Sequence, residues 1–290
     1  MTCNNDTVDI NDLNLINAIS NSIHLDVADF KSYNLHKCVK IESADSINDL
    51  SGLQHTPNLK YLSISIDGNV NLSPISFLTE LSSLLIRGNG KQEYDFKELL
   101  PLNNLVHLDI SNIHIEELTY ISSLLNLTSL RLKTCHIDEI DFLSELNSLL
   151  SLNINDNQVT HLDILSKLTN LETLDIERNN IFNIDAVAPL HYLKWLNASD
   201  NEIEDINSLS QLKRLASLNL SNNKVSNIEP LSKTTLLAWL GIAFNDIRDL
   251  SPLNSLAKLK YLDIEGDSFN QLSTRTHLPN LIAKGIEIFR

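Results

Sequence analysis

The sequence is poor in positive charge and in long hydrophobic runs, and each shortage excludes a class of protein. Its 290 residues hold 22 Lys and Arg against 37 Asp and Glu, for a formal net charge of −15. A chain of this charge repels phosphate backbones and anionic lipid headgroups, so nucleic acid is not an expected partner. No run approaches the roughly 18 apolar residues that span a bilayer, so no membrane insertion is expected.

Cysteine is also scarce, which bears on the compartment. Cys3, Cys38 and Cys135 are odd in number and widely spaced, which is neither a disulfide framework nor a zinc-knuckle pattern. Residues 2–20 lack the basic stretch and the continuous apolar stretch of a conventional signal peptide. The sequence therefore predicts a soluble, cytoplasmic protein in a reducing compartment. The alternative is secretion by a route that uses no conventional signal peptide.

What the sequence has in abundance is a repeat of 22 residues. Three consecutive segments show it without gaps: LETLDIERNNIFNIDAVAPLHY from Leu171, LKWLNASDNEIEDINSLSQLKR from Leu193 and LASLNLSNNKVSNIEPLSKTTL from Leu215. The same template begins at Leu59, Leu81, Leu105, Leu127, Leu149, Leu237 and Leu259, and again at Leu281. Two residues are inserted in the repeat from Leu81, within GNGKQEYDFKELL. One repeat cannot bury its own apolar residues, so neighbouring repeats must stack around a continuous aliphatic core.

The template reads L-x-x-L-x-L-x-x-N-x-I-x-x-I-x-x-L-x-x-L-x-x. Its first part alternates apolar and polar residues, as a half-buried strand does, and its second part is apolar at every third residue, which suits 3₁₀ or extended turns. This pattern resembles the leucine-rich repeat family, in the 22-residue class of bacterial internalins and a regulatory subunit of protein phosphatase 1. The resemblance implies an α/β solenoid, a horseshoe with a concave parallel β-sheet and a convex side of 3₁₀ or extended turns.

An asparagine column supports this interpretation. Asparagines stand eight residues after the start of most repeats, at Asn89, Asn157, Asn179, Asn201, Asn223 and Asn245. Cys135 and Asp267 take the same place, whereas Ile113 departs from it, with Asn112 one place early. A buried amide can satisfy backbone groups that lose their partners where the chain leaves the strand. We expect a structural ladder at these positions.

Both ends of such a solenoid need covers. An N-terminal amphipathic helix over about residues 9–30 is indicated by apolar residues at helical spacing, namely Ile10, Leu13, Ile16, Ile19 and Ile23. At the other end, LIAKGIEIF reads as a final strand. We expect an N-terminal helical cap over residues 1–36 and one continuous solenoid over residues 37–290, with about ten repeats and a terminal strand.

Enzyme and cofactor motifs are nearly absent. The chain has no G-x-S-x-G, H-E-x-x-H, G-x-G-x-x-G or P-loop sequence, and Gly88-Asn89-Gly90-Lys91 is better explained as a surface loop. We therefore expect neither catalysis nor a cofactor. His114 and His136 share a column in adjacent repeats, with Glu116 and Asp138 two residues beyond them. They are weak candidates for a metal site, because their counterparts in later repeats are not ligands.

The concave face carries the clearer signal. Residues between the core-facing Leu and Ile of each strand project to solvent there. Both tryptophans of the chain, Trp195 and Trp239, stand at the same position of their repeats, two repeats apart. Tyr261 has that position in the next repeat, and Phe244 is expected at the edge of the concave face. Tryptophan and tyrosine are the usual anchors of interfaces. The alternative is that the rings only cover the sheet.

The charged residues of this face indicate what it could bind. Carboxylates flank the aromatic residues at Asp175, Glu177, Asp263 and Glu265, whereas Arg87, Arg131 and Lys133 lie nearer the N-terminus. An aromatic patch with an acidic rim suits a partner with basic and apolar groups.

The sequence therefore predicts a non-enzymatic protein–protein interaction scaffold that recognises a partner protein through its concave sheet. Two alternatives stay open, a glycan- or metal-ion-binding solenoid and a secreted bacterial effector or adhesin of internalin type. The second is what the resemblance to internalins implies. The resemblance to the phosphatase regulator implies an intracellular partner enzyme instead.

Overall fold

The structure is a computed structural model that describes residues 8–26 and 30–289 of the chain. The chain forms two compact units, Met1–His136 (unit 1) and Ile137–Arg290 (unit 2). The expected division into a cap over residues 1–36 and a single solenoid over residues 37–290 stays a prediction. Cys3 lies outside the described residues.

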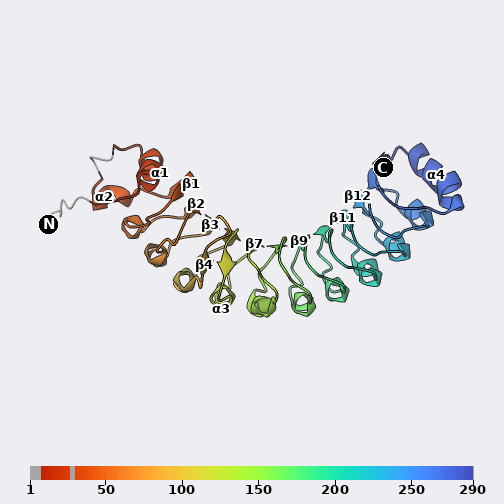
Figure 1. Ribbon diagram of the computed structural model, residues 1–290, viewed down its shortest axis with the longest axis horizontal. Helices are drawn as coiled ribbons and strands as arrows, with labels where there is room; N and C mark the ends of the chain where they lie inside the picture. Colours follow the sequence, from red (N-terminus) through yellow and green to blue (C-terminus); the bar gives the residue numbers. More distant parts are fainter. Residues whose placement is uncertain (1–7, 27–29, 290) are drawn as a thin grey trace. The chain divides into compact units, whose positions relative to one another are not determined.

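Unit 1 is built on a parallel sheet in which every strand follows the previous one in space (Figure 1). Its strands are β1 (Lys40–Ile47), β2 (Tyr61–Ile66), β3 (Ser83–Arg87), β5 (His107–Ser111) and β7 (Ser129–Lys133). The leucines of the template pair in register, Leu62 with Leu84 and Leu84 with Leu108, and all three are buried. In the inserted repeat, β4 (Glu93–Tyr94) pairs with β6 (His114–Ile115) in a second, two-stranded sheet. A short helix, α3 (Thr119–Ser122), follows β6.

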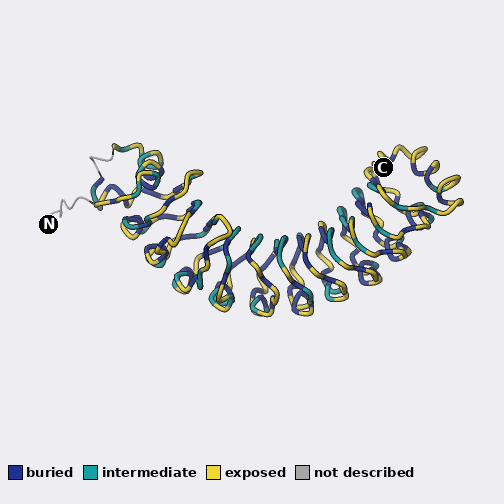
Figure 2. Tube along the Cα trace, viewed as in Figure 1, coloured by how far each residue is buried: buried dark blue, intermediate teal, exposed yellow. Residues whose placement is uncertain are grey.

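Unit 2 repeats the same arrangement with shorter strands. They are β8 (Ser151–Asn153), β9 (Thr173–Asp175), β10 (Trp195–Asn197), β11 (Ser217–Asn219), β12 (Trp239–Gly241), β13 (Tyr261–Asp263) and β14 (Glu287–Phe289). Each pairs in parallel with the next, so that residues 22 apart, such as Leu174 and Leu196, lie side by side. The alternation along each strand buries the leucines on one face and leaves the side chains between them on the other, which we call the open face. Figure 2 shows how buried residues alternate with less buried ones along the chain.

The second half of most repeats forms a 3₁₀ turn, as predicted, whereas the repeat from Leu105 has α3 there and the repeat from Leu259 has helical segments over residues 273–283. Examples in unit 2 are Asp163–Lys167, Asn207–Gln211, Glu229–Lys233 and Ser251–Ser255. Their apolar residues recur every third position and meet the core, as Leu209 and Leu231 do. Pro230 and Pro252 stand in the first turn, where a missing N–H costs no hydrogen bond. The sequence pattern and the structure therefore agree on a leucine-rich repeat architecture of strand and 3₁₀ turn in each unit.

The N-terminal helix is shorter than expected. α1 spans Leu13–Ile23 and α2 spans Ser32–Leu35, so a single helix over residues 9–30 was wrong. Asp12 caps α1 by accepting hydrogen bonds from the backbone of Asn14 and Leu15, at 2.9 and 3.0 Å. The helix ends before His24, whose φ is 54°. Of the predicted apolar face, Ile10 and Ile19 are buried and Ile16 and Ile23 are half-buried, whereas Leu13 is 68% exposed. Leu15 and Ala18 are the further buried residues of this helix.

The C-terminal end differs as well. The segment expected to be a strand from Leu281 begins instead within α4 (Leu278–Ala283), which a wide-turn helical segment, Ser273–His277, precedes. Leu278 and Leu281 are buried. The final strand, β14, pairs with β13, so the predicted terminal strand exists but starts six residues later. The apolar spacing fits helix and strand over so short a run, and here the helix buries it.

The asparagine ladder forms in unit 2. Asn179 shows the pattern: its side-chain oxygen accepts from the backbone N–H of Val159 at 3.0 Å, and its amide nitrogen donates to the carbonyls of Ile154 and Ile176 at 3.1 Å. The same kind of bonds is made by Asn157, Asn201, Asn223 and Asn245. The structural interpretation of these five residues is confirmed.

In unit 1 the ladder prediction fails at Asn89. This residue is exposed, and its amide group donates to Asp67. The insertion places Gln92 inside instead, where its side-chain oxygen accepts from the backbone N–H of Asn89 at 3.0 Å. Cys135 does occupy the column as a buried thiol, close to the carbonyl of Ile110.

Candidate binding surface

The aromatic residues singled out from the sequence lie on the open face of unit 2. The register across β10 to β13 sets Trp195, Ser217, Trp239 and Tyr261 side by side. Trp195 is 37% exposed, Tyr261 is 42% exposed and Trp239 is half-buried. The two indole rings therefore lie outside the core, two strands apart, with Tyr261 next to Trp239.

Two glycines make room for aromatic rings, and the sequence interpretation missed both. A Cβ atom added at Gly241 would lie 2.8 Å from Cη2 of Trp239 and 2.6 Å from the side-chain oxygen of Asn219. The far edge of the indole thus occupies the place of a side chain at position 241. A glycine on the open face two residues after a tryptophan was the available signal.

Phe244 has the same relation to Gly266. A Cβ atom at Gly266 would lie 2.5 Å from Cδ1 of the Phe244 ring. Phe244 is 49% exposed and has a φ of 54°, a conformation that bulky side chains rarely adopt. Its backbone N–H donates to the carbonyl of Glu265 at 2.7 Å. The strand-to-turn junction therefore presents this ring at the edge of the open face.

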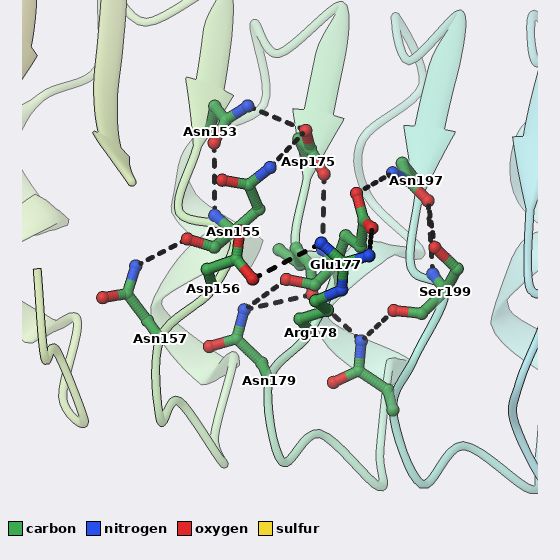
Figure 3. A network of polar contacts seen from close by, with 12 residues as sticks. Asn153, Asn155, Asp156, Asn157, Asp175, Glu177, Arg178, Asn179, Asn197 and Ser199 are labelled. Atoms are coloured by element: carbon green, nitrogen blue, oxygen red, sulfur yellow. Dashed lines mark hydrogen bonds and ion pairs between the residues drawn. The ribbon is translucent and has the colours of Figure 1, made fainter. Parts of the chain in front are cut away.

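The four predicted acidic residues separate into two pairs, and the first is occupied within the protein (Figure 3). Asp175 is buried, and its carboxylate accepts from the side-chain amides of Asn153 at 2.7 Å and Asn155 at 3.4 Å. Glu177 accepts from Asn197 at 3.0 Å and lies 3.4 Å from the guanidinium of Arg178. These carboxylates stabilise the sheet itself, and their expected role in steering a partner stays a prediction.

The second pair has no such partners. In the part of the chain that the structure describes, no cationic side chain lies within ion-pair distance of Asp263 or Glu265. The Asp263 carboxylate accepts only a long bond, 3.3 Å, from the backbone N–H of Glu265. Glu265 is exposed. Asp263 pairs with Gly241 in the register, so it lies beside the far edge of the Trp239 ring.

One acidic group below this surface has an unusual pKa. Asp267 takes the asparagine place in the last full repeat, and one of its oxygens accepts from the backbone N–H of Asn245 and Ile247, at 3.2 and 3.3 Å. The other oxygen is buried and has no hydrogen-bond partner among the described residues. Burial raises the pKa of this carboxyl to about 6.

The histidine pair in unit 1 is adjacent, as expected from its column. The rings of His114 and His136 have their centroids 5.4 Å apart, and Nδ1 of His114 lies 3.0 Å from Oε1 of Glu93. Over residues 8–26 and 30–289, however, no three His, Cys, Asp or Glu side chains gather closely enough to hold a metal ion. Glu116 and Asp138 do not complete a set there, and we do not carry the metal hypothesis further.

The open face of unit 1 is polar and has a different chemistry. A pocket of about 210 Å³ is lined by the hydroxyl side chains Ser63, Ser65 and Ser111 together with Arg87 and Asp109. Burial raises the pKa of Asp109, and Nε of Arg131 lies 3.7 Å from its carboxylate. The lining of this pocket includes no aromatic residue from the described ranges. The Gly88–Lys91 segment forms an exposed turn, as its interpretation as a surface loop predicted.

No helix in the described ranges is both long enough and apolar enough to cross a membrane. Cys38 and Cys135 are both buried, and burial raises the pKa of both thiols, that of Cys135 to about 12. Neither thiol is therefore a nucleophile near neutral pH.

Comparison with known proteins identifies the repeat. Residues 193–233 match the family model of leucine-rich repeats, which spans two copies. The internalin InlF of Listeria monocytogenes is similar in structure with a TM-score of 0.79 and 22% identity, over 96% of this chain and 94% of its own. No curated protein sequence matches the chain.

Two similar structures are complexes. The ectodomain of the Arabidopsis thaliana receptor kinase GASSHO1/SCHENGEN3 with CASPARIAN STRIP INTEGRITY FACTOR 2 gives a TM-score of 0.59 and 20% identity, over 76% of this chain and 31% of its own. The TLR13–ssRNA13 complex gives 0.60 and 23%, over 82% and 42%. At these identities the likeness establishes the fold alone: the chain has the fold of leucine-rich repeat proteins and is similar in structure to an internalin.

Proposed function

We propose that this protein is a non-enzymatic scaffold that binds another protein through the open face of unit 2. The observation that carries the proposal is the placement of both tryptophans on that face, with Tyr261 beside Trp239. Partly exposed indole rings cost solvation free energy in an isolated protein and are the commonest anchors of interfaces.

The sheet is suited to such a role because it is rigid. Each strand is hydrogen-bonded to its neighbours, and the asparagine ladder fixes the chain where it leaves the strand. Side chains on the open face are therefore held in place before a partner arrives, and docking loses little conformational entropy. Trp195, Trp239, Tyr261 and Phe244 are the proposed anchors, and Asp263 and Glu265 are the proposed acidic rim.

The test begins with affinity capture followed by mass spectrometry, and each captured candidate is then purified and titrated against defined variants. Trp195→Ala combined with Trp239→Ala should weaken binding at least about 100-fold, because each anchor contributes about 2 kcal/mol or more. Phe182→Ala is the matched control, since Phe182 is exposed in a loop away from the open face. Normal binding by the double variant would refute the site.

Stability measurements keep this test interpretable. The two tryptophans lie outside the core, so the double variant should unfold within a few degrees of the wild-type protein, the scale of about 1 kcal/mol. A large drop in melting temperature would mean that the rings serve to cover the sheet. That outcome would support the alternative interpretation, in which the aromatic residues have no partner.

The purified protein and its captured partner also distinguish two other roles. Aromatic rings beside carboxylates can also hold sugars, so calorimetry against a panel of glycans tests the glycan alternative. An internalin-type role, in which a secreted bacterial protein contacts a host protein, requires the captured partner to come from another organism. A partner enzyme from the same cell would favour the intracellular role.

A further inference from the structure

The surface around Trp239 combines aromatic rings with carboxylates that have no ion-pair partner among residues 8–26 and 30–289. Glu287 pairs with Tyr261 and Asp263 pairs with Gly241 in the register, and Glu265 follows Asp263 on the same face. Within the described ranges, none of these three carboxylates has a cationic side chain at ion-pair distance. Asp175 and Glu177, by contrast, accept hydrogen bonds from neighbouring side chains. The carboxylates without a described cationic partner therefore lie at the C-terminal end of the open face of unit 2.

The glycine at position 241 brings the indole and the charge together. Because Gly241 has no side chain, the far edge of the Trp239 ring lies over it, with Cη2 2.8 Å from the place of the missing Cβ. Asp263 is the neighbour of Gly241 on β13, about 4.8 Å away in the direction of the strand hydrogen bonds. A group that contacts the edge of this ring is therefore within reach of the Asp263 carboxylate.

Resting on the proposed function, we propose that the Trp239–Asp263 surface is a subsite for an arginine side chain of the partner protein. A guanidinium is planar and always charged, so it can stack on an aromatic ring and direct N–H groups from its edge to a carboxylate. The ammonium of lysine is a strongly hydrated point charge without that planar edge. Glu265 and Glu287 add attraction at longer range, and no described cationic side chain lies close enough to neutralise them.

Trp195 provides an internal comparison. The next residue of its strand on the open face is Asn197, which is buried and donates to Glu177. Asn197 pairs with Asp175 and Asn219 in the register, so a carboxylate does lie beside this site, but Asp175 already accepts hydrogen bonds from Asn153 and Asn155. Trp195 is therefore an apolar anchor, and the arginine selectivity belongs to Trp239 alone.

The test uses ¹⁵N-labelled protein and three synthetic peptides, acetyl-Gly-Gly-X-Gly-Gly-amide, in which X is arginine, lysine or citrulline. Citrulline has the shape of arginine without its charge. The chain has two tryptophans, so two indole N–H resonances report on the two rings, and Trp195→Phe assigns them. The arginine peptide should shift the Trp239 resonance saturably, the lysine peptide should bind at least threefold more weakly, and citrulline should cause no shift.

Charge variants test the carboxylates directly. Asp263→Asn combined with Glu265→Gln should weaken binding of the arginine peptide at least tenfold, and Gly241→Ala, which displaces the ring, should also weaken it. Glu204→Gln is the matched control, because Glu204 is exposed in a loop outside the open face. High salt should weaken the interaction, since the charges are exposed.

Several results would overturn this inference. They are an equal shift with citrulline, a shift confined to Trp195, and unchanged binding by the Asp263→Asn, Glu265→Gln variant. If the tryptophan double variant still fails to bind the captured partner, such a result refutes the arginine subsite alone. Normal partner binding by that double variant refutes the proposed function as well.

Discussion

Units 1 and 2 are built on the same 22-residue template, yet they satisfy the backbone after each strand in different ways. In unit 2 the strands have three residues and asparagine side chains bond to the chain as it turns away. In unit 1 the strands of the main sheet have five to eight residues, and the backbone continues in the small β4–β6 sheet or meets Gln92. A repeat of this kind therefore needs its donors and acceptors paired, but either side chains or backbone can do it.

The open faces differ in the same manner. Unit 1 presents hydroxyls, Arg87 and Arg131 around a half-buried Asp109. Unit 2 presents aromatic rings beside Asp263 and Glu265, for which the described residues supply no ion-pair partner. The leucines that set the register are equivalent in both units. Binding chemistry and backbone support thus vary independently of the core.

Removing a ladder asparagine should produce the largest effect and should distinguish the units. Asn179→Ala leaves the buried N–H of Val159 and the carbonyls of Ile154 and Ile176 without this partner. We expect a loss of about 3 kcal/mol or more in the free energy of unfolding, measured by urea denaturation. Asn89→Ala in unit 1 should cost less than about 1 kcal/mol, because Asn89 is exposed. Equal losses would remove the distinction between side-chain and backbone support.

Replacing the one acidic member of the ladder in unit 2 should have an intermediate effect that depends on pH. The pKa of Asp267 is about 6 in the folded protein, above its ordinary value of 3.8. The stabilisation from the protonated form is therefore complete below about pH 4 and is lost as pH rises through 6. Asp267→Asn supplies a permanent amide donor, so it should match the wild type at pH 4. At pH 7.5 it should exceed the wild type by about 1–2 kcal/mol, a range that allows for solvent screening.

Urea denaturation at pH 4, 5, 6 and 7.5 checks this expectation. Asn245→Asp is the reciprocal variant and should introduce a similar pH dependence one repeat earlier, because Asn245 donates to the carbonyls of Leu220 and Ile242 at 3.0 Å. A difference between Asp267→Asn and the wild type that stays constant over this pH range would contradict the assignment.

The smallest effect concerns the residue that precedes the ladder position in both units. Thr134 has a φ of 55°, a left-handed conformation that is costly for a β-branched residue and tolerated by asparagine. Thr134→Asn should stabilise the protein by about 0.5–1 kcal/mol. Asn222, with the same φ in unit 2, provides the inverse: Asn222→Thr should destabilise by a similar amount. Thermal unfolding measures both, and opposite signs would mean that local contacts outweigh the backbone preference.

Sequence reasoning reached the repeated architecture because the core positions are periodic. Leu174 and Ile176 mark which face of β9 is buried, and the same alternation places Trp195 and Trp239 on the open face. Columns also predicted the adjacency of His114 and His136. These features follow from the period alone.

What the sequence could not provide are side-chain directions and irregular ends. Asp175 and Asp263 stand in the same column, and only the geometry shows that Asn153 and Asn155 occupy the first. The insertion after Gly88 changes which residue turns inward, so that Gln92 replaces Asn89. The segment from Leu281 was predicted as strand from its first residue, although its first three residues belong to α4, because a few apolar residues fit either period.

The inserted repeat of unit 1 has a practical consequence for work on this protein. Its extra residues leave the pairing of Leu84 with Leu108 intact, so added length is absorbed in the turn. Gly90, at the tip, is exposed, and a Cβ atom added there would meet no other described atom within 4 Å. A cysteine at Gly90 would have to adopt a φ of 81°, a strained conformation for it, but a reporter dye attached there would meet no steric clash with the described residues and would leave unit 2 unaltered.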